Sequence, residues 1–356
     1  MTKTNKISRE IFPAAARPRF LEKFSRRGFL GSIGATGAGL SLSSLLGACG
    51  TGAQAQGQPI GLPPNSRRLK AAFTNGGLSH SWCAQGKQAA EAWGKWLGVD
   101  IVWYDGQTNT DLQRKALDAI ASQHWDFVAV QANGVDTLIE PIQSLLDNGI
   151  PVIQMDTEID SSHSTDVTTF LSPDNISMAE IASTVLFEKI GGQGKVIMTQ
   201  GQLDHSGVAG RTEGFYQALA RYPGIDLVAK APADWDAKKT AQLWEGDLAR
   251  YKDIAGGFFH NDDMALAALN VIHKAGRTTL VTSIDAMPPA IKAVMNGEML
   301  ATVRNPAGRI HGWAVLVGAQ VANGAKHIPK YILADGPLVT PQNGEGLIYL
   351  ENQFLL

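Results

Sequence analysis

The chain has 356 residues, which is enough for one large or two medium-sized domains with a substantial core. Hydrophobic residues make up 44% and charged residues 18%, the ordinary balance of a soluble globular protein. The formal net charge is −2 and no long basic run occurs, so the composition argues against binding to nucleic acid or, by charge alone, to a membrane surface.

The first 48 residues are predicted to be an export signal rather than part of the globule. A basic leader ends in SRRGFLG (25–31), and an uncharged, weakly apolar run follows as far as Ala48. Paired arginines before such a run are typical of twin-arginine export signals. The alternative is a membrane-spanning helix, since residues 28–48 are long enough, but several glycines and hydroxyl-bearing residues disfavour it.

Two processing sites are compatible with the residues that follow. LGAC (46–49) resembles a lipobox, which would make Cys49 a lipid-bearing first residue and anchor the protein to the membrane from the periplasm. AQA (53–55) also fits an ordinary signal-peptidase site. Residues 49–66, rich in Gly, Gln, Pro and Ala, are predicted to be a flexible tether. Cys83 is the one other cysteine, so no disulfide framework is expected.

From residue 67 onward, short apolar runs alternate with helical stretches. In the first half, strands are predicted at LKAAFT (69–74), DIVWYD (100–105), DFVAVQ (126–131) and PVIQMD (151–156). Helices are predicted between them at 85–97, 111–122 and 137–148. Continuous apolar strands separated by amphipathic helices indicate a parallel sheet that is covered on both faces.

The same pattern then starts again. Strands are predicted at GKVIMTQ (194–200), IDLVAKAP (225–232), IAGGFFHN (254–261) and TLVTSID (279–285), with helices at 211–222, 236–250 and 262–275. The strand ends of the two halves correspond at offsets of 125 to 130 residues: Thr74 with Thr199, Gln131 with Asn261, and Asp156 with Asp285. This near-constant offset predicts two similar α/β lobes. Neither first strand is followed by a glycine-rich dinucleotide motif, so no nucleotide cofactor is expected.

Ligands of open α/β sheets bind beyond the carboxyl ends of the strands, so two facing lobes would direct their strand-end residues into one cleft. Two Asp would accept hydrogen bonds there, Asn and Gln would donate and accept, and two Trp would offer flat apolar faces. Such a set suits a small polyhydroxylated molecule. The candidates are His80, Trp82, Gln131, Asp156, Trp235, Asn261 and Asp285.

Five segments, taken in order and with their spacing, resemble the periplasmic ribose- and galactose-type sugar-binding proteins of ABC importers. They are GIPVIQMD (149–156), LSPDN (171–175), GRTEGF (210–215), PADWD (232–236) and NDDMALAAL (261–269). The resemblance covers residues 68–340. It implies the type I fold, in which two Rossmann-like lobes with parallel sheets are joined by three hinge crossings and close on one monosaccharide or related polyol.

The resemblance also implies domain boundaries and partners. It places the crossings near 172–173, 305–306 and 332–333, so that 67–172 and 306–332 form the first lobe, 173–305 the second, and 333–356 an edge and tail of the second. The expected partners are a sugar or polyol, a membrane permease of an ABC transporter and, in some such proteins, a chemoreceptor. No cofactor or metal and no nucleic acid is expected, and the protein is expected to be a monomer.

Carried over by position, the ligand contacts of the family fall on ten residues: His80, Trp82, Gln131, Asp156, Thr157, Arg211, Trp235, Asn261, Asp285 and Asn305. Several depart from the ribose-type pattern. His80 and Gln131 stand where Asn is usual, and Trp82 and Trp235 replace Phe. Cys83 stands where a second aromatic residue is common, and Thr157 where an Arg usually follows the Asp. The architecture therefore transfers, whereas the identity of the sugar does not.

The polar run Asn261-Asp262-Asp263 lies where a strand becomes a helix. Asn261 is predicted to contact ligand hydroxyls, with a structural turn as the alternative. Asp262 is predicted to cap the helix by accepting from the amide of Met264 or Ala265. Asp263 would lie in the first turn, where a negative charge suits the helix dipole.

Structural roles compete with ligand contact for four of the candidates. Trp235 could belong to the core, Trp82 could pack on its own helix, His80 could lie in an exposed loop, and Arg211 could bridge surface carboxylates. His163, His205 and His273 lack metal-ligand spacing and are not assigned a role. The acidic stretch 156–166 contains no calcium-loop pattern.

Two other classes of function compete with a transport receptor. A glycosidase could use Asp156 and Asp285 as a carboxylate pair, but no further group suggests an activated water or nucleophile. The sensor core of a lactose-repressor-type regulator would need an N-terminal DNA-binding unit, whereas this N-terminus is an export signal. A chemotaxis coreceptor is compatible with the receptor hypothesis.

Overall fold

The computed structural model describes residues 67–352. The predicted export signal, the tether and Cys49 lie outside this range. None of the described helices is both long and apolar enough to cross a lipid bilayer.

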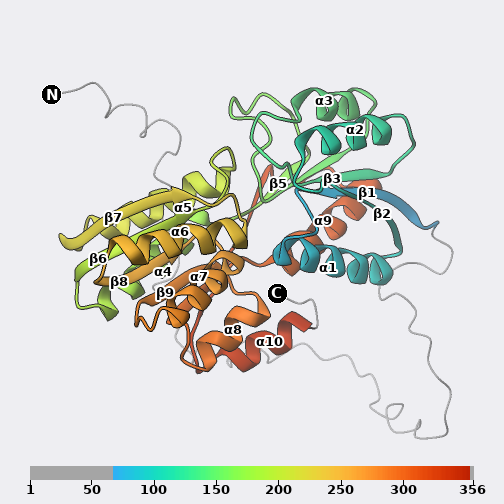
Figure 1. Cartoon of the computed structure of the whole chain (residues 1–356). Helices are drawn as coiled ribbons and strands as arrows, with labels where there is room; N and C mark the ends of the chain where they lie inside the picture. Colours follow the sequence, from blue (N-terminus) through green and yellow to red (C-terminus); the bar gives the residue numbers. More distant parts are fainter. Residues whose placement is uncertain (1–66, 353–356) are drawn as a thin grey trace, which may run out of the picture. The chain divides into compact units, whose positions relative to one another are not determined.

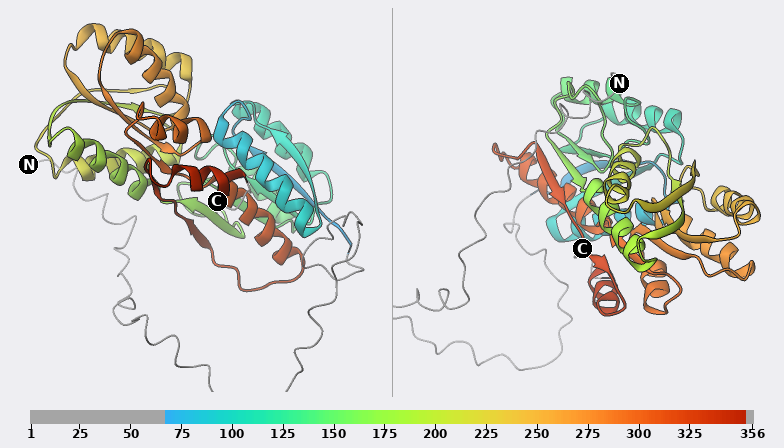
Figure 2. Two further views of the ribbon diagram at one scale, coloured as in Figure 1. Left: turned by 90° about the horizontal axis from the view of Figure 1, so that it is seen from below. Right: turned by 90° about the vertical axis from the view of Figure 1, so that its left-hand side faces the viewer.

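The first lobe is a six-stranded parallel sheet in the order β11-β5-β4-β3-β1-β2 (Figure 1). Its strands are β1 (Leu69–Asn75), β2 (Val99–Asp105), β3 (Phe127–Val130), β4 (Val152–Met155), β5 (Thr169–Pro173) and β11 (Tyr331–Ala334). Its helices are α1 (Ser81–Leu97), α2 (Thr110–Ala121), α3 (Ile139–Asp147) and α9 (Ala307–Ala322). α1 and α9, far apart in sequence, pack side by side (Figure 2).

The second lobe repeats this arrangement in the order β12-β10-β9-β8-β6-β7. Its strands are β6 (Gln193–Gln200), β7 (Gly224–Pro232), β8 (Ile254–Phe259), β9 (Leu280–Asp285), β10 (Ala301–Arg304) and β12 (Leu338–Val339). Its helices are α4 (Asn175–Lys189), α5 (Ser206–Leu219), α6 (Ala237–Arg250), α7 (Asp262–Lys274), α8 (Pro288–Met295) and α10 (Gly344–Asn352). Only the edge strand β12 differs in direction, since it runs antiparallel to β10. The two-lobed α/β fold predicted from the sequence is confirmed.

Each sheet is buried on both faces because alternate residues of its strands enter different core clusters. In β3, Phe127 and Ala129 pack with α1 and α9, whereas Val128 and Val130 pack with α2 and α3. β8 does the same in the second lobe, where Phe259 packs with α6 and α7 and Phe258 with α4 and α5. This is why the strand sequences are continuously apolar.

The chain passes between the two sheets three times. It leaves the first sheet after Pro173 at the end of β5 and returns through Asn305 and Pro306. The third crossing was expected near 332–333, and this is wrong: β11 pairs with β5 as far as Ala334, and β12 begins at Leu338. The short sequence between them, 335–337, therefore makes the crossing.

Two helices begin earlier than the periodicity predicted. α1 starts at Ser81 instead of residue 85, and α5 starts at Ser206 instead of residue 211. The added turns contain buried apolar residues, Trp82 in α1 and Val208 in α5, beside a serine and small residues. A histidine, His80 or His205, occupies the N-cap position of each.

Candidate ligand-binding site

The carboxyl ends of strands from both sheets meet around one cavity of about 70 Å³. Side chains after β1, β3 and β4 come from the first lobe, and side chains at or after the ends of β6 to β10 come from the second. This is the crevice where open α/β sheets bind ligands. The lining residues are Gly76, His80, Trp82, Cys83, Gln131, Ala132, Asn133, Asp156, His205, Arg211, Trp235, Asn261, Asp285 and Asn305.

The structure brings nine of the ten predicted contact residues to this cavity. The exception is Thr157, which is buried behind Asp156 and does not line it. The Thr157 hydroxyl oxygen instead lies 2.7 Å from Nε2 of His205, a residue of the other lobe. Thr157 therefore supports the cavity wall.

Asp156 is the polar centre of the first-lobe side. Its Oδ2 atom accepts a hydrogen bond from Gln131 Nε2 at 3.1 Å and lies 3.5 Å from both Thr157 Oγ1 and His205 Nε2. Burial by itself would raise the pKa of Asp156, but the His205 and Gln131 hydrogen bonds and the Arg211 charge hold it below its ordinary value. The side chain is therefore a carboxylate at neutral pH.

Arg211 is the buried cation of the second-lobe side. Nε donates to Asn175 Oδ1 at 2.9 Å, Nη1 donates to the carbonyl of His260, and Nη2 lies 3.4 Å from Asp285 Oδ1. The guanidinium also lies 5.6 Å from the ring of Trp235, in the range of a cation–π contact. These partners exclude the alternative in which Arg211 bridges surface carboxylates.

Asn305 links this cation to the first lobe at a hinge crossing. The side-chain amide of Asn305 finds hydrogen-bond partners for its oxygen when that oxygen faces Arg211. In this orientation the oxygen accepts from Arg211 Nη2 at 3.0 Å and from Trp82 Nε1 at 3.2 Å. Trp82 Nε1 also lies 3.1 Å from the backbone carbonyl of Asn305. Trp82 belongs to the first-lobe core and also lines the cavity.

Aromatic side chains of both lobes form the apolar walls. Trp235 is half-buried and packs edge-on to His205, with ring centroids 5.4 Å apart. Opposite it, Trp82 packs edge-on to the buried His311 at 5.1 Å. His80 is partly buried rather than fully exposed, and burial lowers its pKa, which favours the neutral ring. Burial raises the pKa of the Cys83 thiol to about 12, so this wall residue is not a thiolate.

The backbone is strained where three of these side chains leave their strands. φ is positive at Asp156 (55°), Trp235 (62°) and Asp285 (120°), a region in which residues other than glycine are uncommon. Such conformations cost on the order of 1–3 kcal/mol each and persist only where surrounding contacts hold them. These three are among nine non-glycine residues of the described chain with a positive φ, and all three line the cavity.

The Asn261-Asp262-Asp263 run is arranged differently from the prediction. Asn261, not Asp262, caps α7: its Oδ1 accepts from the Met264 amide at 3.0 Å while the residue also lines the cavity. The predicted capping role of Asp262 is wrong because its side chain turns into the interior of the lobe. There it accepts from Ser283 Oγ, from Thr302 Oγ1 at 2.8 Å and from the Met287 amide at 2.6 Å.

The buried Asp262 carboxyl fixes the segment that carries Asp285. It holds Met287, and Thr302 accepts from the amide of Ala286 at 3.2 Å. Ala286 has a φ of 54°, so these bonds hold the strained turn that follows Asp285. Burial raises the pKa of Asp262 to about 7, opposed by the hydrogen bonds from Ser283, Met287 and Thr302. Burial likewise raises the pKa of Asp285, and the charge of Arg211 opposes it.

Asp263 lies in the first turn of α7 as predicted, but its carboxylate reaches across to the other lobe. Its two oxygens accept from Ser81 Oγ at 2.9 and 3.0 Å, and Oδ2 accepts from the Ser81 amide at 3.2 Å. Because His80 makes no capping bond with its side chain, this acid from the second lobe serves as a cap for α1.

Two polar residues of the cavity, Asn133 and His205, were not predicted from the sequence. His205 lacks metal-ligand spacing, so the sequence assigned it no role. The internal repeat contained the signal, because the offset of 125 that relates Thr74 to Thr199 also relates His80 to His205. Both residues stand at the N-cap of the helix that follows the first strand of their lobe, α1 after β1 and α5 after β6.

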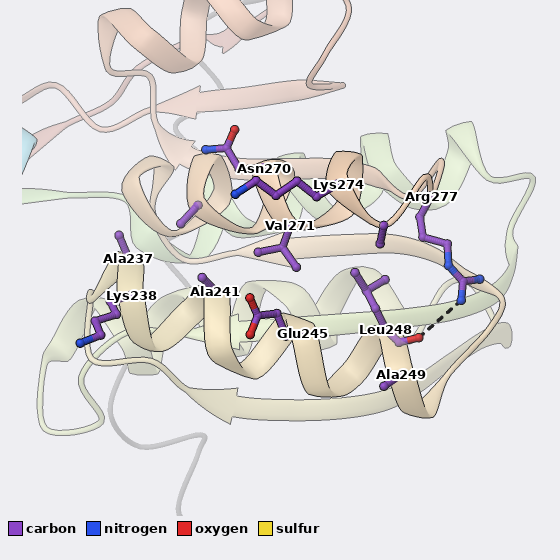
Figure 3. A pocket seen from close by; sticks show the side chains of 12 residues that line it. Ala237, Lys238, Ala241, Glu245, Leu248, Ala249, Asn270, Val271, Lys274 and Arg277 are labelled. Carbon is purple, nitrogen blue, oxygen red and sulfur yellow. Dashed lines mark hydrogen bonds between the residues drawn. The ribbon is translucent and has the colours of Figure 1, made fainter.

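A wider groove of about 690 Å³ lies elsewhere, between α6 and α7 of the second lobe (Figure 3). Alanines form much of its floor, and its polar side chains Lys238, Glu245, Asn270 and Lys274 are exposed. Arg277 at one end donates to the Leu248 carbonyl at 3.5 Å. No buried polar side chain converges on this groove, so it lacks the features of a small-molecule site. Within residues 67–352, no group of three or more potential metal ligands occurs.

Comparison with known proteins gives one family and several relatives. The model of the periplasmic binding protein domain matches residues 71–326. A xylitol-binding protein of Mycolicibacterium smegmatis is 27% identical over 327 residues, covering 90% of this chain and 86% of the relative. A ribose import binding protein of Salmonella typhimurium is 29% identical over 236 residues, covering 66% of this chain and 78% of the relative.

The fold is shared with solved structures. The crystal structure of a galactofuranose binding protein superposes with a TM-score of 0.77 at 23% identity, covering 81% of this chain and 100% of that one. At this identity the likeness concerns the fold alone.

The Asp262 network generates a prediction about stability. Asp262→Ala leaves the Met287 amide without its acceptor and should lower the free energy of unfolding by about 2–4 kcal/mol. Asp262→Asn keeps one oxygen for Met287 and offers amide hydrogens to the Ser283 and Thr302 hydroxyls, so it should cost less than about 1 kcal/mol. Urea unfolding measures both, with the exposed Asp118→Ala as control. Equal stability of Asp262→Ala and the unchanged protein would contradict the bridging role.

Proposed function

The chain belongs to the periplasmic binding protein domain family, and we propose that it is the substrate receptor of an ABC importer that captures a neutral monosaccharide or polyol between its lobes. The observation that carries this proposal is the convergence of nine predicted contact residues from both lobes on one cavity. The relatives described above are named as sugar- or polyol-binding proteins, not as enzymes.

The side chains of the cavity match the hydrogen-bonding capacity of hydroxyl groups. A hydroxyl donates one hydrogen bond and accepts others, and the cavity offers carboxyl acceptors and side-chain amide groups. Trp82 and Trp235 supply apolar faces for the C–H surface of a sugar ring or polyol chain. Aromatic walls with a few placed polar groups are typical of small-molecule sites.

The charges of the cavity favour a neutral ligand. Asp156 and Asp285 are both buried in its wall, and Arg211 is the one Lys or Arg among its lining residues. Asn175, His260, Asp285 and Asn305 already engage all three guanidinium nitrogens of Arg211. A ligand carboxylate or phosphate would therefore meet the Asp156 carboxylate while Arg211 is already engaged by its protein neighbours, which is unfavourable in a buried site.

Ligand capture requires the lobes to move relative to each other. The cavity is small and its acids are almost fully buried, so an opening motion must admit the ligand. Bonds that cross the cleft, such as Asp263 with Ser81 and His205 with Thr157, form when the lobes meet. The three short crossings are the natural hinges for this motion. The ligand-loaded form would then present its cargo to a membrane permease, and a chemoreceptor would be a compatible second partner.

We further propose that the mature protein is monomeric and periplasmic, exported by the twin-arginine route and held to the membrane by a lipid on Cys49. The support is the SRRGFLG motif, the LGAC sequence and the periplasmic family. Replacing Arg26 and Arg27 with Lys should leave the precursor in the cytoplasm, as measured by cell fractionation. Normal export of the double variant would refute the route, and normal membrane retention of Cys49→Ser would refute the lipid anchor.

A thermal-shift screen tests the proposed ligand class, because a compound that binds only the folded protein raises its apparent stability. Xylitol, ribose, galactose and myo-inositol represent neutral polyols and sugars, and gluconate, glucuronate and ribose 5-phosphate represent anions. We expect a stabilising compound among the neutral set and none among the anions. Stabilisation by an anion alone would overturn the neutral-ligand proposal.

Asp156 and Asp285 are expected to contribute directly to affinity. Hydrogen bonds from ligand hydroxyls to a carboxylate contribute about 1.5–3 kcal/mol each. Asn at either position replaces one acceptor oxygen with a donor, so Asp156→Asn and Asp285→Asn should each weaken binding by roughly tenfold to a hundredfold at ~1.4 kcal/mol per decade. Calorimetric titration with the neutral compound that stabilises the protein measures this, with Asp118→Asn as control. Unchanged affinity in both variants would place the site elsewhere.

A further inference from the structure

We propose that His205 is a positioning residue of the binding site, which orients the Asp156 carboxylate from the opposite lobe when the lobes are closed. This inference rests on the proposed function and deepens it. His205 is not among the ten predicted contact residues. Its ring nevertheless lines the cavity, where it lies close to both Asp156 and Trp235.

The hydrogen bonds of His205 fix both the orientation and the tautomer of its neutral ring. Nδ1 accepts a hydrogen bond from the amide of Gly207 at 3.0 Å, as the N-cap of α5. A ring nitrogen that accepts carries no hydrogen, so in the neutral ring the hydrogen is on Nε2. Nε2 is therefore a donor, and the cap holds it in a fixed direction.

That donor is directed at the first lobe. Nε2 lies 2.7 Å from Thr157 Oγ1, which makes the Thr157 hydroxyl the acceptor. The hydroxyl in turn points its own hydrogen toward Asp156 Oδ2, at 3.5 Å. His205, Thr157 and Asp156 thus form a chain of donors that begins in the second lobe and ends on the carboxylate of the first.

This chain selects which oxygen of Asp156 remains for a ligand. Gln131, Thr157 and His205 all approach Oδ2. Within the described residues, no hydrogen bond ends on Oδ1, which leaves its lone pairs for ligand hydroxyls. Because His205 belongs to the second lobe, Asp156 acquires this orientation in the closed arrangement.

His205 also supports the aromatic wall of its own lobe. Its ring meets Trp235 edge-on at 5.4 Å with planes 77° apart. Trp235 has a φ of 62°, a strained conformation that neighbouring contacts must hold. One residue therefore steadies both the carboxylate that accepts from the ligand and the indole that faces it.

His205→Asn separates this role from helix capping. Asn is a strong N-cap residue, so α5 should stay capped and the urea midpoint should not change. Its side chain is too short to reach Thr157, so the donor to the other lobe is lost. We expect affinity for the neutral compound that binds the unchanged protein to fall roughly tenfold, mainly through faster dissociation. The exposed His327→Asn serves as the matched control.

Two further variants make the test specific. Thr157→Val removes the acceptor, so in the double variant with His205→Asn the affinity should fall no further than in either single variant. His205→Gln can restore a donor toward Thr157 and should recover part of the affinity while it lowers the urea midpoint through the lost cap. Titration calorimetry, stopped-flow tryptophan fluorescence and urea unfolding with xylitol, ribose and myo-inositol provide the readouts.

The outcomes distinguish this inference from the proposed function. Tenfold weaker binding by His205→Asn with a normal urea midpoint, and no additional loss in the double variant, supports the positioning role. The positioning role is overturned if His205→Asn binds with the same affinity as the unchanged protein. It is also overturned if the double variant loses the product of the two single losses of affinity. A protein that binds none of the neutral compounds refutes the proposed function, and the role of His205 with it.

Discussion

A buried carboxylate is unstable in a protein unless hydrogen-bond donors surround it, and Asp156 takes its donors from both lobes. Gln131 and Thr157 approach from the first lobe and His205 from the second. The arrangement of the site follows from this need. Only when the strand ends of the two sheets face each other can the carboxylate be buried, ionised and still have one oxygen left for a ligand.

A different set of residues holds the second acid, Asp285. Arg211 lies beside it, and Asn305 connects that guanidinium to Trp82 of the first lobe. Asn305 also lies at one of the three crossings between the lobes. The hydrogen-bond network of the cavity and the path of the chain between the lobes therefore share this residue. A movement of the lobes would therefore change the surroundings of both acids, which is how the proposed capture would couple binding to closure.

Much of this could be predicted from the sequence because it depends on repeating local patterns. The apolar strands, their spacing and the offset between the halves predicted two lobes. Residues at the strand ends predicted seven of the cavity residues, and the family resemblance added Arg211 and Asn305. What failed depends on the direction of a side chain. Asp262 and Asn261 are adjacent and equally good caps by type, and only the positions of Ser283, Thr302 and Met287 decide that Asp262 turns inward. His205 was missed because its partners, Thr157 and Trp235, are distant in sequence.

The most direct test of closure around a ligand is small-angle X-ray scattering of the protein alone and at saturation with a neutral polyol or sugar that calorimetry shows to bind. Cross-lobe contacts such as Asp263 with Ser81 hold the lobes together in the arrangement described, which is the one proposed for the loaded form. The radius of gyration should therefore decrease when the ligand is added. Scattering profiles that coincide with and without a saturating ligand would contradict capture by lobe closure.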